Sequence, residues 1–166
     1  MNYQDTAIGP YQELVVLIAA SKRDAPPHPL LETLGGYVNL AVGWWRVEAF
    51  LHASGTDATA DIKITWNFTG STGTGTGRGC QGPQVNTTDA GVTTMRAAGN
   101  LLTTPVPYGI VNTSQASLCH EDLLINVTSA GQLTLFWAQN TAVAGATSTL
   151  STASRMYVTQ LTYQAT

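Results

Sequence analysis

Two neighbouring runs of the sequence alternate apolar and polar residues with the two-residue period of a β-strand that buries one face. The apolar positions are Trp45, Val47, Ala49 and Leu51 in the first run and Ile62, Ile64, Trp66 and Phe68 in the second. The intervening residues 54–60 carry Gly and Asp, which are typical of a turn. The pattern therefore predicts two strands that pair as an antiparallel hairpin.

Further short strands are predicted along most of the chain. The apolar run at residues 12–21 predicts a strand that is buried on both faces or covered by a partner, because its β-branched residues favour a strand over a helix. More short strands or turns are predicted at residues 84–99, 101–114, 121–129, 131–140 and 154–163. Many short strands separated by turn signals indicate an all-β domain, here a jelly-roll-like antiparallel β-sandwich.

Two segments lack this alternation. Residues 22–30 contain Pro26 and Pro27 and predict an extended linker without backbone hydrogen bonds. We therefore expect residues 1–35 to form an extended N-terminal arm and residues 36–166 to form the sandwich. The Gly- and Thr-rich residues 70–84 predict a flexible loop; they lack the Gly-Lys-Ser/Thr ending of a phosphate-binding loop.

Charge is scarce in this chain. Charged residues make up 10% of the sequence and the net charge is −3, whereas about 25% is usual for globular proteins. A slightly acidic chain argues against a nucleic-acid partner, which needs a basic surface. The apolar run in residues 12–21 is far shorter than the about 20 residues that span a membrane, so no membrane partner is expected. A polar but weakly charged surface suits a protein that is largely covered by neighbours or works outside a cell.

The candidate chemical clusters favour structural interpretations. Cys119, His120, Glu121 and Asp122 have metal-ligand chemistry, but adjacent residues of an extended chain point to opposite faces. A solvated acidic turn is the better interpretation.

Glu48 and Asp61 would be cross-strand neighbours on the predicted hairpin and could imitate the carboxylate pair of a glycosidase. Pairing with Arg46 and Lys63 explains them more simply. We expect no enzyme activity, no metal and no cofactor.

The two cysteines, Cys80 and Cys119, leave two alternatives open. They form either one disulfide or two reduced thiols. Reduced thiols are favoured because nothing in the sequence indicates an oxidising compartment.

Motifs within residues 36–75 and 130–163 resemble a β-sandwich module of tailed-bacteriophage virion proteins, found in head-decoration (cement) proteins and in some tail or fibre-tip proteins. The matching positions are Arg46, Val47, Glu48, Asp61, Ile62, Lys63, Trp137, Ala138, Gln139 and Asn140. The chain departs from the pattern at Ala153, where Gly is common, and at Gln160, where Arg is common.

The resemblance implies a homotrimeric capsid decoration protein that is made in the host cytoplasm, binds the major capsid protein and lies on the virion surface. The uncharged return after residue 140 could then contact its symmetry copies without burying an unpaired charge. The implied trimer-interface residues are Trp137, Gln139, Asn140, Thr147 and Thr149. Trp137 has a second interpretation, compatible with the first, in which it fills the core of its own subunit.

The resemblance also gives the N-terminal arm a role. The arm would add a strand to a neighbour or lie over the capsid surface. The implied capsid-contacting residues are Tyr3, Tyr11, Pro26 and Pro27.

A receptor- or glycan-binding tail or fibre-tip module is the alternative function. Its candidate contact residues are the aromatic Trp44 and Tyr37, near the predicted hairpin. A depolymerase-like enzyme would need a carboxylate cluster, which the sequence does not show.

Overall fold

The computed structural model describes residues 14–17, 21–24, 32–57, 61–85, 95–110, 116–141 and 145–161, with side chains described at 37–57, 61–85, 99–110, 116–141 and 145–161. These residues contain thirteen β-strands and no helix. In chain order the strands are β1 (Leu14–Leu17), β2 (Ser21–Asp24), β3 (Glu32–Leu40), β4 (Gly43–Gly55), β5 (Ile62–Phe68), β6 (Ser71–Thr72), β7 (Gly77–Pro83), β8 (Met95–Asn100), β9 (Val106–Tyr108), β10 (Ser117–Ser129), β11 (Gly131–Gln139), β12 (Thr147–Leu150) and β13 (Arg155–Leu161).

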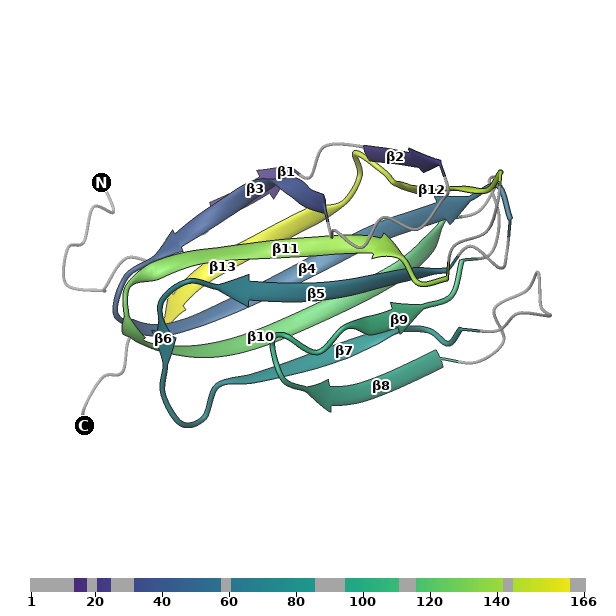
Figure 1. Ribbon diagram of the computed structural model, residues 1–166. Coiled ribbons are helices and arrows are strands. Elements are labelled where there is room, and N and C mark those ends of the chain that lie inside the picture. Colours follow the sequence, from purple (N-terminus) through teal and green to yellow (C-terminus); the bar gives the residue numbers. More distant parts are fainter. Residues whose placement is uncertain are drawn as a thin grey trace, which may run out of the picture.

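Two antiparallel sheets pack against each other as a β-sandwich (Figure 1). The larger, nine-stranded sheet has the order β1-β13-β4-β10-β7-β8, with β12, β2 and β6 paired off this path. The smaller, four-stranded sheet has the order β3-β11-β5-β9. The all-β sandwich predicted from the sequence is confirmed, and its jelly-roll topology stays a prediction.

The predicted hairpin of β4 and β5 is wrong, although both segments are strands. β4 pairs with β10, β12 and β13 in the larger sheet, and β5 pairs with β11 and β9 in the smaller one. Glu48 and Asp61 therefore are not cross-strand neighbours. The physical reason is that each of the two strands has one apolar face. Both faces are buried equally well when the strands pair in one sheet and when they face each other from opposite sheets. Alternation predicts which face is inside and leaves the pairing open.

The core fills the space between the two sheets. Alternate residues of β4 point inward, and Val47, Ala49 and Leu51 are fully buried there, as the sequence predicts. From the smaller sheet, Trp66 and Trp137 contribute the largest of the fully buried side chains. Aromatic burial of this size dominates core energetics.

Part of the expected N-terminal arm is paired with the body of its own chain. β1 pairs with β13, so the strand predicted in residues 12–21 is confirmed at Leu14–Leu17. β2 pairs with β12 through Ser21–Asp24, so the first residues of the predicted linker do carry backbone pairing. Strand edges leave backbone groups unpaired, and these short strands cover two such edges. The proposed capsid contacts Tyr3, Tyr11, Pro26 and Pro27 lie outside the described residues.

The predicted flexible loop at residues 70–84 is wrong for most of its length. Its second half is the strand β7, which lies between β10 and β8 in the larger sheet. Arg78, Cys80 and Gly82 are buried and alternate with exposed or half-buried residues. Low sequence complexity concealed this alternation, because glycine occupies most of the outward positions.

The predicted acidic turn at residues 119–122 is also wrong. These residues lie inside β10, where Cys119 and Glu121 point into the core and His120 and Asp122 point outward. Adjacent residues do point to opposite faces, as expected for an extended chain. Glu121 is nevertheless fully buried, because the opposite sheet supplies partners that no local pattern shows.

Leu123→Ala and Leu124→Ala give a matched test of the sandwich. Leu123 is fully buried and Leu124 is 41% exposed on the other face of the same strand. We expect Leu123→Ala to lower the free energy of unfolding by about 2–5 kcal/mol, because it leaves a cavity in the core. Leu124→Ala should cost no more than about 1 kcal/mol. Urea titrations of both variants check this; equal losses would contradict the assigned faces.

Candidate functional site

A buried ion pair between Arg78 of β7 and Glu121 of β10 lies at the centre of a polar cluster in the core. Both side chains are fully buried. The guanidinium binds the carboxylate with two hydrogen bonds, Nε to Oε2 at 2.5 Å and Nη2 to Oε1 at 2.8 Å. This bidentate geometry is the strongest form of an arginine–carboxylate contact.

Two aromatic side chains of the smaller sheet complete the shell of the carboxylate. Trp66 of β5 donates its indole N–H to Oε2 of Glu121 at 3.2 Å. Tyr108 of β9 donates its hydroxyl to Oε1 at 2.5 Å. Each carboxylate oxygen thus accepts two hydrogen bonds. This shell compensates for the loss of water, without which a buried charge is very costly.

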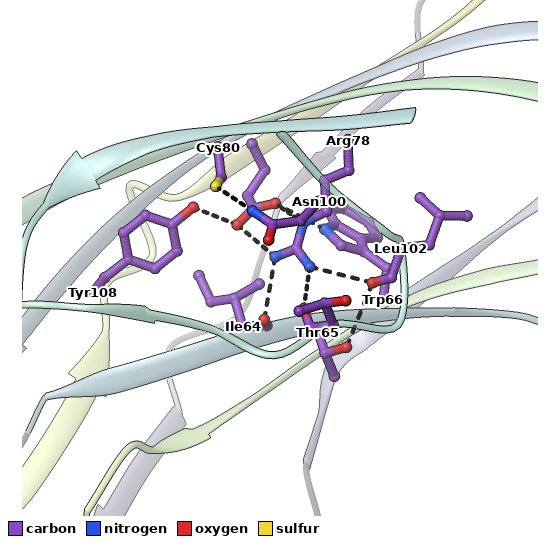
Figure 2. Close-up of polar contacts among 10 residues, drawn as sticks. Ile64, Thr65, Trp66, Arg78, Cys80, Asn100, Leu102 and Tyr108 are labelled. Atoms are coloured by element: carbon purple, nitrogen blue, oxygen red, sulfur yellow. Dashed lines mark hydrogen bonds and ion pairs between the residues drawn. The ribbon is translucent and has the colours of Figure 1, made fainter. Parts of the chain in front are cut away.

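Three backbone carbonyls complete the shell of the guanidinium (Figure 2). Nη1 of Arg78 donates to the carbonyls of Leu102 at 3.2 Å and Thr104 at 2.6 Å. Nη2 also donates to the carbonyl of Ile64 at 3.1 Å. All five N–H groups of the guanidinium therefore have partners. One side chain connects β7 and β10 to β5 in the opposite sheet and to the turn between β8 and β9.

Burial keeps Tyr108 and Cys119, beside the ion pair, in their neutral forms. Burial, together with the Glu121 carboxylate, raises the pKa of Tyr108, so that its hydroxyl remains a hydrogen-bond donor. Burial and Glu121 also raise the pKa of the Cys119 thiol well above its usual value. Cys80 and Cys119 are both buried, and no disulfide joins them. Thiols become nucleophilic as thiolates, so the environment of Cys119 opposes reactivity.

The outer face of the larger sheet carries a second, shallower cluster. Arg46 contacts Asp122 through two hydrogen bonds of 3.1 Å and Glu48 through one of 3.0 Å. Phe50 stacks on His120 with ring centroids 4.5 Å apart. Glu48 does pair with Arg46, but both lie on β4, so the predicted cross-strand ion pairing is wrong. Half-exposed pairs of this kind add little stability, and these groups mainly give the face its shape and charge.

The residues expected at a trimer interface mostly make contacts within their own chain. Trp137 has 0% exposure and fills the core, which agrees with its second interpretation. Gln139 donates from its side-chain amide to the carbonyl of Ala146 at 3.0 Å. In β12, Thr147 is buried and Thr149 is half-buried.

Asn140 and Asp61 join the ends of two strands of the smaller sheet. The Asn140 backbone N–H donates to the Asp61 carbonyl at 2.6 Å. Asp61 is 2% exposed, and its carboxylate accepts the backbone N–H of Ile110 at 3.0 Å. Both motif residues therefore support the backbone at this end of the sandwich.

The aromatic residues suggested for glycan binding do not share one surface. Trp44 lies on the outer face of β4 in the larger sheet, and Tyr37 is 58% exposed on β3 in the smaller sheet. A Cβ on Gly75 would lie 2.7 Å from the Trp44 ring, and Gly75 has a φ of +84°. The turn that contains Gly75 therefore packs closely on the indole of Trp44. The two aromatics face away from each other and cannot form a joint stacking platform.

The described residues hold neither a metal-binding cluster nor a membrane-spanning helix. They contain no group of three or more His, Cys, Asp and Glu side chains that could hold a metal ion. They also contain no helix of sufficient length and apolar character to cross a membrane.

Comparisons with known proteins give no match: no protein family, no curated protein and no solved structure corresponds to this chain.

Sequence reasoning missed the Arg78–Glu121 pair, although a signal was present. Both residues stand in short alternating segments, Arg78 before Cys80 and Glu121 between Cys119 and Leu123. A charge on the inward row of a predicted strand indicates a buried partner elsewhere. The two residues are 43 positions apart in the sequence, so only the pairing of β7 with β10 brings them together.

Glu121→Gln tests the buried Arg78–Glu121 ion pair. Asp122→Asn is the matched control at the exposed Arg46–Asp122 pair. We expect Glu121→Gln to lower the free energy of unfolding by about 3–5 kcal/mol, because it leaves the Arg78 charge buried and uncompensated. Asp122→Asn removes an exposed partner of Arg46 and should cost less than about 1 kcal/mol. Urea titration measures both. A Glu121→Gln variant no less stable than Asp122→Asn would contradict this role.

Asp61→Asn tests whether the buried Asp61 carboxylate makes the free energy of unfolding depend on pH. Burial raises the pKa of Asp61 in the folded chain, and its hydrogen bond from Ile110 offsets part of that rise. Above the folded-state pKa of Asp61 the charged carboxylate lowers the stability of the fold. This loss disappears as the pH falls through that pKa towards the pKa of about 4 that the group has in the unfolded chain. Asp61→Asn should therefore be at least as stable as the wild type at pH 7, with the advantage shrinking in acid. Urea titrations at neutral and acid pH measure this; an equal loss of stability at both would contradict it.

Proposed function

We propose that the chain is a structural virion protein of a tailed bacteriophage, a trimeric decoration protein that stabilises the head by bridging capsomers. Its place would be the outer surface of the capsid, and its partners would be its own copies and the major capsid protein. In this role the protein performs no chemistry and acts through the area that it buries.

The observation that carries this proposal is the pairing of two of the three motifs on which the phage resemblance rests; the third, Arg46-Val47-Glu48, lies on β4 in the larger sheet. The Asp-Ile-Lys motif, which begins one residue before β5, and the Trp-Ala-Gln-Asn motif, which ends one residue after β11, lie side by side in the smaller sheet. In register, Ile62 faces Gln139, Lys63 faces Ala138, and Ile64 faces Trp137. Segments separated by more than seventy residues thus form one continuous unit. This register supports a shared structural module over a chance likeness of separate strands.

The chemistry of the motif residues also suits a structural subunit. The Asp61 carboxylate and the Gln139 amide both bind backbone groups of their own chain. The buried Arg78–Glu121 pair has all its hydrogen bonds satisfied within the core. These polar groups support the architecture, and a rigid body is what a clamp between capsomers requires.

Trimerisation would make capsid binding firm even when each contact is small. Three linked subunits that contact the capsid together turn the second and third contacts into intramolecular events. Scarce surface charge helps, because covering such a surface leaves few charges without partners.

Copy number in the particle tests the proposal. Virions of the phage that encodes the chain would be purified and analysed by quantitative mass spectrometry against the major capsid protein. We expect a copy number comparable to that of the major capsid protein. Only a few copies per particle would favour a tail or fibre location instead, and absence from the particle would overturn the virion assignment.

A further inference from the structure

We infer that a cavity at one end of the sandwich is a binding site for one ring of a neutral sugar, a function beyond the proposed structural role. The cavity has a volume of about 360 Å³, within the range of about 300–1,000 Å³ that is usual for small-molecule sites. It opens between two turns, at residues 73–76 before β7 and at residues 101–104 after β8. The pairing of Arg78 with Asn100 brings these turns to the same end of the larger sheet (Figure 1).

The lining of the cavity combines apolar surface with neutral polar groups. Phe68 and Leu102 supply the apolar surface, and Thr72, Thr76 and Thr103 supply hydroxyls. Among the described residues that line the cavity, none has a charged side chain. Because a buried charge needs a partner, this lining favours a neutral ligand over a phosphate, a carboxylate or a metal ion.

The apolar surface is a part of the core that the chain leaves uncovered. Phe68 and Leu102 are the two partly buried apolar side chains that pack against the core of the described residues, and both line the cavity. A Cβ on Gly70 would lie 2.8 Å from the Phe68 ring, so the ring keeps its place only over a glycine. An aromatic ring in a concave site is suited to cover one face of a ligand.

Asn126 of β10 holds the first wall of the cavity in place. Its backbone carbonyl accepts the N–H of Gly73 at 2.8 Å, and its own backbone N–H donates to Oγ1 of Thr76 at 3.0 Å. Its side-chain amide donates to the carbonyl of Thr74 at 3.1 Å. One residue thus makes three hydrogen bonds to the turn at residues 73–76.

The buried ion pair holds the second wall. The carbonyl of Leu102 accepts Nη1 of Arg78 at 3.2 Å and the backbone N–H of Trp66 at 3.1 Å. A hydrogen bond from the Thr104 N–H to the Leu101 carbonyl, at 3.2 Å, closes the turn. Both walls are therefore fixed before a ligand arrives, which lowers the entropic cost of binding.

The free hydroxyls of the lining match the chemistry of a sugar. Among the described residues, Thr72 and Thr103 make no hydrogen bond through their hydroxyls, and the hydroxyl of Thr76 is used only as an acceptor. All three can therefore still donate a hydrogen bond, and a hydroxyl can also accept one. A pyranose has an apolar C–H face, which suits the ring of Phe68, and a rim of hydroxyls that donate and accept. No other class of neutral ligand pairs these two features as closely.

Titration of the isotope-labelled full chain with glucose, galactose, mannose and N-acetylglucosamine tests the inference by nuclear magnetic resonance. The backbone amides of Gly70, Gly73 and Gly77 report on the cavity that they line, and those of Gly109 and Gly145, outside it, are the controls. We expect at least one sugar to shift the first set selectively. The Kd should be on the order of a millimolar, as for other ligands of this size.

Two variants test the chemistry of recognition. Thr72→Val/Thr103→Val removes two hydroxyls at similar side-chain size and should weaken binding at least about tenfold, because two hydrogen bonds to the sugar are lost. Phe68→Leu keeps an apolar side chain against the core but removes the ring, and should weaken binding at least about threefold. Thr152→Val is the matched control and should bind like the wild type, since Thr152 is exposed and does not line the cavity.

Three results would overturn the inference. One is the absence of a selective shift with all four sugars at about ten times the expected Kd. Another is a shift of the control glycines in place of those that line the cavity. The third is binding that stays unchanged in the threonine double variant or in Phe68→Leu, which would mean that neither feature recognises a sugar. The copy number in the particle tests the structural role separately, so the two proposals fail independently.

Discussion

The ion pair between Arg78 and Glu121 is the constraint on which much of the sandwich depends. A charged pair in a dry core is tolerated only if its remaining hydrogen-bonding groups find partners. Here the pair itself belongs to the larger sheet, and those partners come from the smaller sheet and from the turn between β8 and β9: Trp66 and Tyr108 bind the carboxylate, and carbonyls that include that of Ile64 bind the guanidinium. The sheets must therefore lie in one relative position for the pair to be satisfied. A shifted register would leave a charge buried and unpaired, which costs several kcal/mol.

The same pair links the interior to the outer face of the larger sheet. Arg78 faces inward, while its neighbours Gly77 and Gly79 face outward. The guanidinium also holds the turn that carries Leu101. A single strand thus fixes the core on one side and offers a flat surface on the other.

Prediction from the sequence succeeded where a feature depends on near neighbours along the chain. The alternation of Val47, Ala49 and Leu51 identified a strand and its buried face, and the structure agrees. It failed where pairing depends on distant residues. β4 and β5 share the alternating pattern yet lie in opposite sheets. Of the candidate interface residues, the burial of Trp137 was foreseen as an alternative, whereas the hydrogen bond of Gln139 within its own chain was not.

The sequence by itself determined the class of fold, because side-chain alternation and β-branched residues act within a few positions and need no long-range information. It also determined the low charge of the surface. Only the tertiary structure decided that Glu121 is a buried anchor and that the turns before β7 and after β8 line one cavity. Both depend on β7 lying beside β10 and β8. That neighbourhood depends on the combination of registers that gives Arg78 and Glu121 their hydrogen-bond partners across the core, which is a property of the whole sandwich.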